Sequence, residues 1–163
     1  MSPTDITVLP ISQVDKGWIL EWMSEQWHSP QVVAHDRVFY PHQLPGFVAF
    51  MGSERVGLLT YNVENQALEI VSLNSAREKR GVGTALVEAA EREARRAGLG
   101  RVWLITTNDN LDALGFYQKR GFHIVGVHPG AVDRARRMKA VIPLVGEHGI
   151  PIHDELELEK SLI

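Results

Sequence analysis

Residues 72–84 read SLNSAREKRGVGT, and they decide the fold because they join a run of β-forming residues directly to the start of a helix. Gly81 and Gly83 carry no Cβ atom, so a ligand can approach the backbone closely there. The first N–H groups of a helix have no partner within it, and the helix dipole is positive at that end. Positive charge is added by Arg77, Lys79 and Arg80. The stretch therefore predicts an anion site that is suited to phosphate.

Two familiar phosphate loops do not fit this stretch. The dinucleotide-binding pattern G-x-G-x-x-G/A would need glycine or alanine at position 86, where the chain has Leu86. The P-loop pattern G-x-x-x-x-G-K-[ST] does not occur in the sequence. Close packing of the helix start against the sheet is the structural alternative for the two glycines.

The segments on both sides of this stretch predict a mixed α/β sheet. Three β-forming runs at 46–51, 56–63 and 67–73 are separated by short turns, which predicts an antiparallel meander. A helix at 81–97, a strand at 101–106, a helix at 111–119 and a strand at 122–127 follow. The outer parts indicate a strand at 6–9, a helix from Ser12 to about 28–30, an irregular helix-and-loop segment at 31–45, a helical turn at 131–139 and a final strand at 152–160. The crossover between 67 and 106 predicts a parallel pair within the sheet.

Residues 110–122, NLDALGFYQKRGF, complete a second pattern. Together with residues 67–89 they resemble the GNAT superfamily of acyl-CoA-dependent N-acyltransferases, in which a short helix carries N-x-x-A-x-x-F-Y and G-F opens the next strand. The matching residues are Asn110, Ala113, Phe116, Tyr117, Gly121 and Phe122. The resemblance covers residues 55–127 closely. It implies one GNAT domain over residues 1–163, of class α/β, with a mixed, mostly antiparallel sheet of about seven strands, a splayed parallel central pair and helices on both faces.

The resemblance implies that acetyl-CoA is the co-substrate, with no metal. Its pantetheine arm is expected to form hydrogen bonds with the backbone of Val71 and Leu73. Asn110 is expected either to contact that arm or to keep the two parallel strands splayed apart. The pyrophosphate is expected on a loop made of Lys79, Arg80, Gly81, Val82, Gly83 and Thr84. The family's loop usually has Gln or Arg at the position of Glu78, whose carboxylate we therefore expect to point away from the pyrophosphate.

Acyl transfer from a thioester to an amine needs a base for the amine, donors for the oxyanion and an acid for the leaving thiolate. By resemblance, the N–H of Leu73 serves the oxyanion and Tyr117 is the acid, although Tyr117 beside Phe116 also suits a core position. Glu69 is the candidate base, because strand alternation places it on the face of Val71 and Leu73. A solvated or structurally paired glutamate, with a water chain as the base, is the alternative for Glu69.

The composition excludes several other classes of protein. The 163 residues include no cysteine, which excludes a disulfide scaffold, a cysteine-ligated zinc site and a cysteinyl acyl-enzyme. A formal charge of −3 disfavours a nucleic-acid binder. No apolar run reaches the roughly 18 residues of a membrane helix, and no signal peptide is visible, so we expect a cytoplasmic protein. The spacing of His28, His35 and His42 fits no usual metal site.

The sequence thus predicts an N-acetyltransferase that acts on a primary amine of a small molecule or peptide by direct attack in a ternary complex. The alternative is a catalytically silent acyl-CoA-binding regulatory module of the same fold. A homodimer is a further possibility, because a final strand at 152–160 that lay exposed at the sheet edge could pair with a second subunit.

Overall fold

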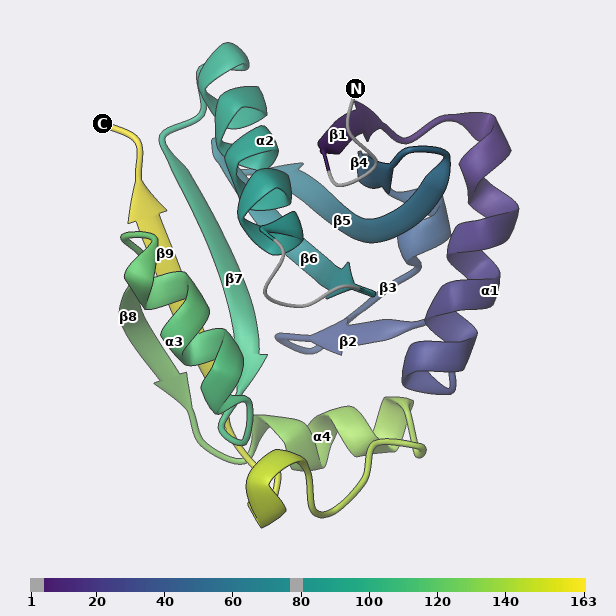
Figure 1. The fold of residues 1–163 in the computed structure, drawn as a ribbon. Coiled ribbons are helices and arrows are strands. Elements are labelled where there is room, and N and C mark those ends of the chain that lie inside the picture. Colours follow the sequence, from purple (N-terminus) through teal and green to yellow (C-terminus); the bar gives the residue numbers. More distant parts are fainter. Residues whose placement is uncertain (1–4, 77–80) are drawn as a thin grey trace.

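The computed structural model describes residues 5–76 and 81–163, apart from the side chain of Trp27. Its main sheet has seven strands in the order β1-β4-β5-β6-β7-β9-β8 (Figure 1). Their bounds are Ile6–Pro10 (β1), Gly46–Met51 (β4), Glu54–Glu64 (β5), Ala67–Ser75 (β6), Arg101–Thr107 (β7), Glu155–Ser161 (β9) and His123–His128 (β8). The β6–β7 pair is parallel and the other neighbouring pairs are antiparallel. The expected mixed sheet and the β4–β5–β6 meander are confirmed.

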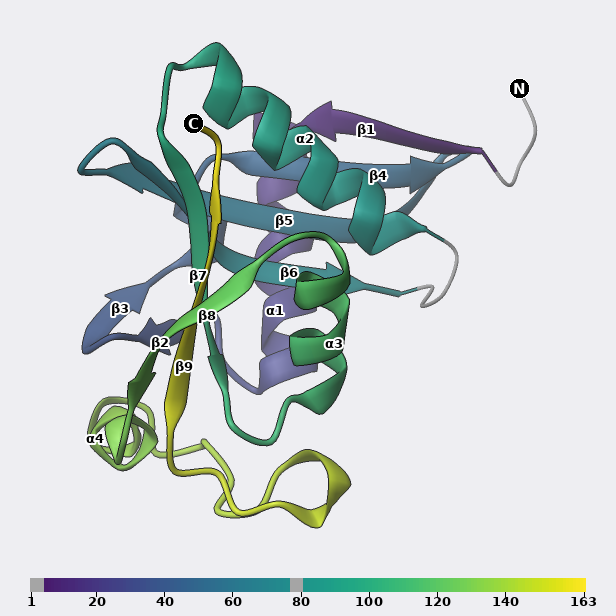
Figure 2. The same ribbon diagram turned by 90° about the vertical axis from the view of Figure 1, so that its left-hand side faces the viewer.

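Helices cover both faces of the sheet, as expected (Figure 2). Helix α1, Lys16–Trp27, lies on one face, whereas α2, Val82–Arg96, and α3, Leu111–Lys119, lie on the other. A 3-10 turn at Gln13–Asp15 leads into α1, and the N–H of Ser12 donates to the Asp15 carboxylate at 2.8 Å. Helix α4, Ala131–Met138, lies beyond one end of the sheet (Figure 1). None of the helices in the described part of the chain combines the length and the apolar character that crossing a membrane requires.

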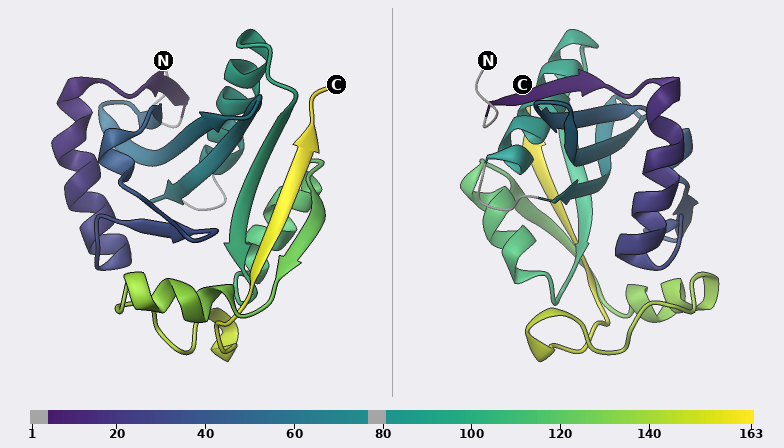
Figure 3. Two further views of the ribbon diagram at one scale, coloured as in Figure 1. Left: turned by 180° about the vertical axis from the view of Figure 1, so that it is seen from behind. Right: turned by 45° about the vertical axis from the view of Figure 1, so that its right-hand side comes forward.

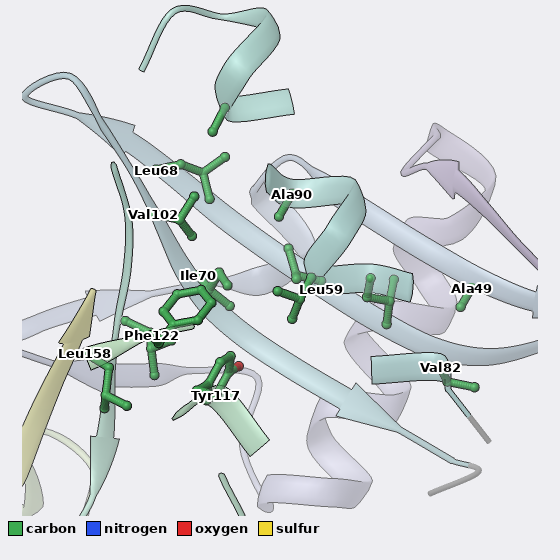
Figure 4. Close-up of a cluster of buried hydrophobic side chains, with 14 of the residues drawn as sticks. Ala49, Leu59, Leu68, Ile70, Val82, Ala90, Val102, Tyr117, Phe122 and Leu158 are labelled. Carbon is green, nitrogen blue, oxygen red and sulfur yellow. The ribbon is translucent and has the colours of Figure 1, made fainter. Parts of the chain in front are cut away.

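The larger core lies between the sheet and the α2–α3 face (Figure 4). Helix α2 buries an apolar stripe against side chains of β5, β6 and β7, namely Leu59, Leu68, Ile70 and Val102. On the other face, Ile19 and Met23 of α1 pack against Val48 and Leu58. Burial of each such large apolar side chain contributes about 1.5–3 kcal/mol. The two cores hold the central strands rigidly from both sides.

Gly57 of β5 allows α2 to approach the sheet closely. A Cβ atom at this position would lie 2.5 Å from Cγ1 of Val82 and 3.0 Å from Cδ1 of Leu86. We expect Gly57→Ala to lower the free energy of unfolding by about 1–3 kcal/mol, because the added methyl group overpacks this contact. Urea denaturation measures the effect. Gly17→Ala is the control, since a Cβ atom there would meet nothing within 4 Å, and equal stability of the two variants would contradict the packing argument.

The expectation of an irregular helix-and-loop segment at 31–45 is wrong in its first half. Strands β2, Val32–Ala34, and β3, Arg37–Phe39, form a two-stranded hairpin. Its two turn residues, His35 and Asp36, both have positive φ, of 39° and 63°. Such turns are usually marked in sequence by Asn-Gly or Asp-Gly, so the His-Asp pair gave no hairpin signal. A 3-10 turn at Pro41–Gln43 completes the segment.

The final strand does not lie at the sheet edge, which corrects the expectation for residues 152–160. Strand β9 pairs with β7 on one side and with β8 on the other. The edge strand on this side of the sheet is β8, which comes earlier in the chain. The proposed pairing of the final strand with a second subunit therefore has no open edge to use.

Candidate functional site

Strands β6 and β7 diverge in the middle of the sheet. They pair only from Ala67 with Arg101 to Ile70 with Leu104. Both strands continue beyond this point, β6 to Ser75 and β7 to Thr107, and Figures 2 and 3 show them running apart. The expected splay is confirmed. The side of β6 that faces β7 beyond Ile70 therefore lacks a neighbouring strand, and its backbone groups are open to an extended ligand.

A β-bulge at Val71 corrects the expected orientation of Glu69. The register of β5 with β6 passes from Tyr61–Ile70 to Thr60–Ser72 and leaves Val71 without a partner. The side chain of Glu69 consequently shares a face with Ser72, whereas Leu73 lies on the opposite face. Simple alternation had placed Glu69 with Val71 and Leu73, and an inserted residue breaks that alternation.

The start of α2 lies beside this divergence, near the C-terminal end of β6. Gly81 is the N-cap residue with φ of 80°, a conformation that favours glycine, and no side chain caps the helix there. The N–H groups of Val82, Gly83 and Thr84 have no acceptor within the helix. Lys79 and Arg80, together with Glu78, lie outside the described residues. The described part of the predicted phosphate loop is thus a free helix N-terminus.

Gly83 has a packing role as well. A Cβ atom on Gly83 would lie 3.1 Å from Cζ and 3.2 Å from Cε1 of the Phe116 ring. The second glycine of the G-x-G pattern therefore permits the first turn of α2 to contact α3. Glycine at this position thus allows close packing and also suits the expected binding of an anion.

Arg120 is a site residue that the sequence analysis missed. Its Nε and Nη2 donate to Oγ1 of Thr84 at 2.9 and 2.6 Å, and its Nη1 donates to the carbonyl of Phe116 at 2.6 Å. The guanidinium also lies 3.7 Å from the centre of the Phe116 ring. A cation beside a helix N-terminus is unfavourable in the dipole field, and a bound anion would offset that cost. The contact between Arg120 and Thr84 joins residues 36 positions apart, so no local sequence pattern predicts it.

Helix α3 places Asn110 and Tyr117. The side-chain oxygen of Asn110 accepts from the N–H of Ala113 at 3.1 Å, which makes Asn110 the N-cap of α3. Tyr117 is 5% exposed, and its ring packs between those of Phe116 and Phe122. Burial raises the pKa of Tyr117. No described residue forms a hydrogen bond with its hydroxyl, which Figure 4 shows at one end of the ring within the core cluster.

Glu69 is buried on the opposite face, below the β2–β3 hairpin. It is 3% exposed, and its Oε2 lies 2.7 Å from Nε2 of His35. This contact identifies Glu69 as a paired glutamate, and it raises the pKa of His35. The pair opens into a hollow of about 260 Å³, here called the hairpin hollow, which is lined by His35, Arg37, Asn62, Glu69, Arg101, Trp103 and three neighbours.

The candidate metal ligands do not gather at this site. His35 is engaged with Glu69, and His28 is the C-cap of α1. Within the described ranges, one group of three suitable side chains comes together, Asp112, Glu147 and His148, and all three are exposed. Exposed acidic clusters of this kind are common without an ion. That the protein needs no metal stays a prediction.

Comparison of the sequence and of the fold with known proteins finds acetyltransferases. The model of the Acetyltransferase (GNAT) family matches residues 16–122. The protein YxbD of Bacillus subtilis (strain 168), named as uncharacterized, is 42% identical over 158 residues, which is 96% of this chain and 99% of YxbD. An IAA acetyltransferase from Bacillus cereus ATCC 14579 has a similar structure, with a TM-score of 0.75, 20% identity and coverage of 97% of this chain and 100% of that one. A Bacillus subtilis acetyltransferase in complex with CoA gives a TM-score of 0.70, at 20% identity, over 97% of this chain and 98% of that one.

Proposed function

Because the chain belongs to the GNAT acetyltransferase family, we propose that it transfers an acetyl group from acetyl-CoA to a primary amine of a small molecule or peptide. One observation carries the proposal: β6 and β7 part beyond Ile70 and Leu104, next to the uncapped N-terminus of α2. The divergence suits an extended arm, and the helix start suits its diphosphate. The proposal treats residues 1–163 as one GNAT domain.

In the proposed complex, the pantetheine arm takes the place of a strand beside β6 and bonds to the backbone of Val71 and Leu73. The diphosphate lies on the N–H groups of Gly81, Val82, Gly83 and Thr84, with Lys79 and Arg80 supplying positive charge. The positive charge of Arg120 beside Thr84 adds to the attraction. Asn110 shapes the wall of the cleft by capping α3. A Bacillus subtilis acetyltransferase of similar fold was solved in complex with CoA, which supports CoA as the ligand of this fold.

The proposed reaction is direct attack in a ternary complex. The amine nitrogen bonds to the thioester carbonyl carbon, and the N–H of Leu73 donates to the oxyanion. As the C–S bond breaks, the thiolate of CoA takes a proton from Tyr117, and the tyrosinate regains a proton from solvent before the next turnover. The amine loses its proton to a base on the hairpin face, the face on which Glu69, the candidate base from the sequence, lies beside His35. Since Glu69 and Tyr117 lie on opposite faces of the sheet, the thioester in the divergence would lie between base and acid.

A silent acyl-CoA-binding module is the second candidate, and one observation favours it. Tyr117 is 5% exposed in a core of aromatic side chains, where it would be retained for packing alone. A silent module would bind CoA but release no thiol with any amine.

A thiol-release screen tests the proposed function. The protein is incubated with acetyl-CoA and a panel of primary amines, comprising monoamines, diamines, amino acids and peptide N-termini, and free CoA is measured. The proposal expects amine-dependent CoA release above hydrolysis and a matching N-acetyl product by mass spectrometry. Binding of acetyl-CoA without release for any amine would favour the silent module.

A further inference from the structure

The turn of the β2–β3 hairpin is held in place above the divergence. The N–H of His35 donates to Oε1 of Glu155 in β9 at 3.1 Å. On the other side of the turn, Arg134 of α4 lies 3.2 Å from the carboxylate of Asp36. Lys139 donates to the carbonyl of Gln31 at 2.7 Å, before β2 begins. Figure 3 shows the hairpin on the same face of the sheet as α1. The position of the His35 backbone is thus fixed by contacts to two other elements.

The imidazole of His35 covers the carboxylate of Glu69. The Glu69 side chain is 4% exposed, whereas that of His35 is 24% exposed. The ring of His35 lies 5.2 Å from that of Trp103 and 5.8 Å from that of Phe39, so its orientation is restricted on both sides. A molecule that enters the hairpin hollow therefore meets the imidazole before it can reach Glu69.

Carboxylates predominate around this imidazole. Glu69 and Glu155 are both 3% exposed, and they contact the side chain and the backbone of His35. The cations nearby are engaged elsewhere: Arg37 pairs with Glu64 at 2.6 Å, and Arg101 pairs with Glu159 at 2.8 Å. Further charged or titratable groups near the turn are Asp36, His128 of β8, Arg134 and Lys139. The surroundings favour a positive charge on His35.

We propose that His35 receives the proton of the acceptor amine and that Glu69 is a positioning residue that acts through it. This inference deepens the proposed function and rests on it. Since Nε2 bonds to Glu69, the neutral imidazole donates from Nε2 and keeps its lone pair on Nδ1. As the bond from nitrogen to the acetyl carbon forms, the proton of the amine moves to Nδ1. Glu69 then stabilises the imidazolium, which later returns the proton to water in the hollow.

The test compares three variants in steady-state thiol release with the best amine of the screen. His35→Gln can keep a hydrogen bond to Glu69 but cannot take a proton, so we expect kcat to fall about 100-fold with an unchanged Kd for acetyl-CoA. In the wild type, kcat/KM should rise with pH, because the neutral imidazole is the active form. In Glu69→Gln the midpoint of that rise should move to lower pH, since the bond that raises the pKa of His35 is weakened. His123→Gln, an exposed histidine on β8, is the matched control.

Chemical rescue separates proton transfer from a structural role. His35→Ala leaves a gap that opens into the hairpin hollow of about 260 Å³, so added imidazole should restore activity in a pH-dependent manner. Thermal unfolding verifies that each variant is folded. An active wild type whose His35→Gln variant keeps its kcat and pH midpoint would overturn the inference alone. A wild type that binds acetyl-CoA but releases no thiol with any amine would overturn the proposed function, and the inference with it.

Discussion

Tyr117→Phe is expected to lower kcat for acetyl transfer by about 10²- to 10⁴-fold, with a Kd for CoA within about twofold of the wild type. The loss follows from the leaving group, because a departing thiolate gains from a nearby proton donor. The phenol of Tyr117 is protonated at neutral pH and can donate; burial raises its pKa, so the transfer needs the negative charge that develops on the departing sulfur. The variant deletes one oxygen atom and retains the ring that packs against Phe116 and Phe122.

Tyr61→Phe is the matched control for this prediction. Tyr61 is partly buried and stacks on Phe47, on the part of the sheet covered by α2. Its variant should retain wild-type kcat, because its hydroxyl interacts with Glu93 and Arg96 in the last turns of α2 and not with the start of that helix. Steady-state thiol release measures kcat, and calorimetry measures the affinity for CoA. A wild-type kcat in Tyr117→Phe would remove Tyr117 from the chemistry and leave it as a core residue.

Gly83→Val is expected to weaken acetyl-CoA binding by at least about 100-fold, which corresponds to about 2.7 kcal/mol. A Cβ atom at this position already lies 3.1 Å from the Phe116 ring, and the two methyl groups of valine need more space. The first turn of α2 must therefore move relative to α3. Such movement displaces the N–H groups that hold the diphosphate, and it disturbs the contact between Arg120 and Thr84.

Gly115→Ala is the control for Gly83→Val. Gly115 is next to the same phenylalanine, in α3, but a Cβ atom there would meet nothing within 4 Å. We expect it to bind CoA normally and to gain up to about 1 kcal/mol of stability from the better helix former. Calorimetric titration with CoA is performed well below the unfolding temperature of each variant, because the overpacking in Gly83→Val also destabilises the fold. Wild-type affinity in Gly83→Val would show that the start of α2 does not bind the cofactor.

The elements that we propose to hold the cofactor were predictable because their signals are contiguous in the sequence. The β6 strand, the glycine-rich loop and α2 follow one another within residues 67–96, and a helix start has the same electrostatics wherever it occurs. The motif that begins at Asn110 likewise lies within a single helix. The expected sheet, its crossover and its divergence follow from such local patterns together with the handedness of strand–helix–strand connections.

The hairpin face was not predictable because long-range contacts define it. His35 and Glu155 are 120 residues apart in the chain, and His35 and Glu69 are 34 apart. The bulge at Val71, which turns Glu69 toward the hairpin, depends on how β5 and β6 align. The sequence of one strand does not indicate where its pairing with a neighbouring strand shifts by one residue. The same reason explains why β9 was misplaced at the sheet edge, since strand order is set by partners and not by pattern.

A crystal structure of the protein with CoA bound tests the central claim most directly. The account predicts electron density for the pantetheine arm between β6 and β7, beyond Ile70 and Leu104, with the diphosphate on the N–H groups of residues 81–84. Density for CoA at another surface, or continued pairing of β6 with β7 where the arm should lie, would contradict it.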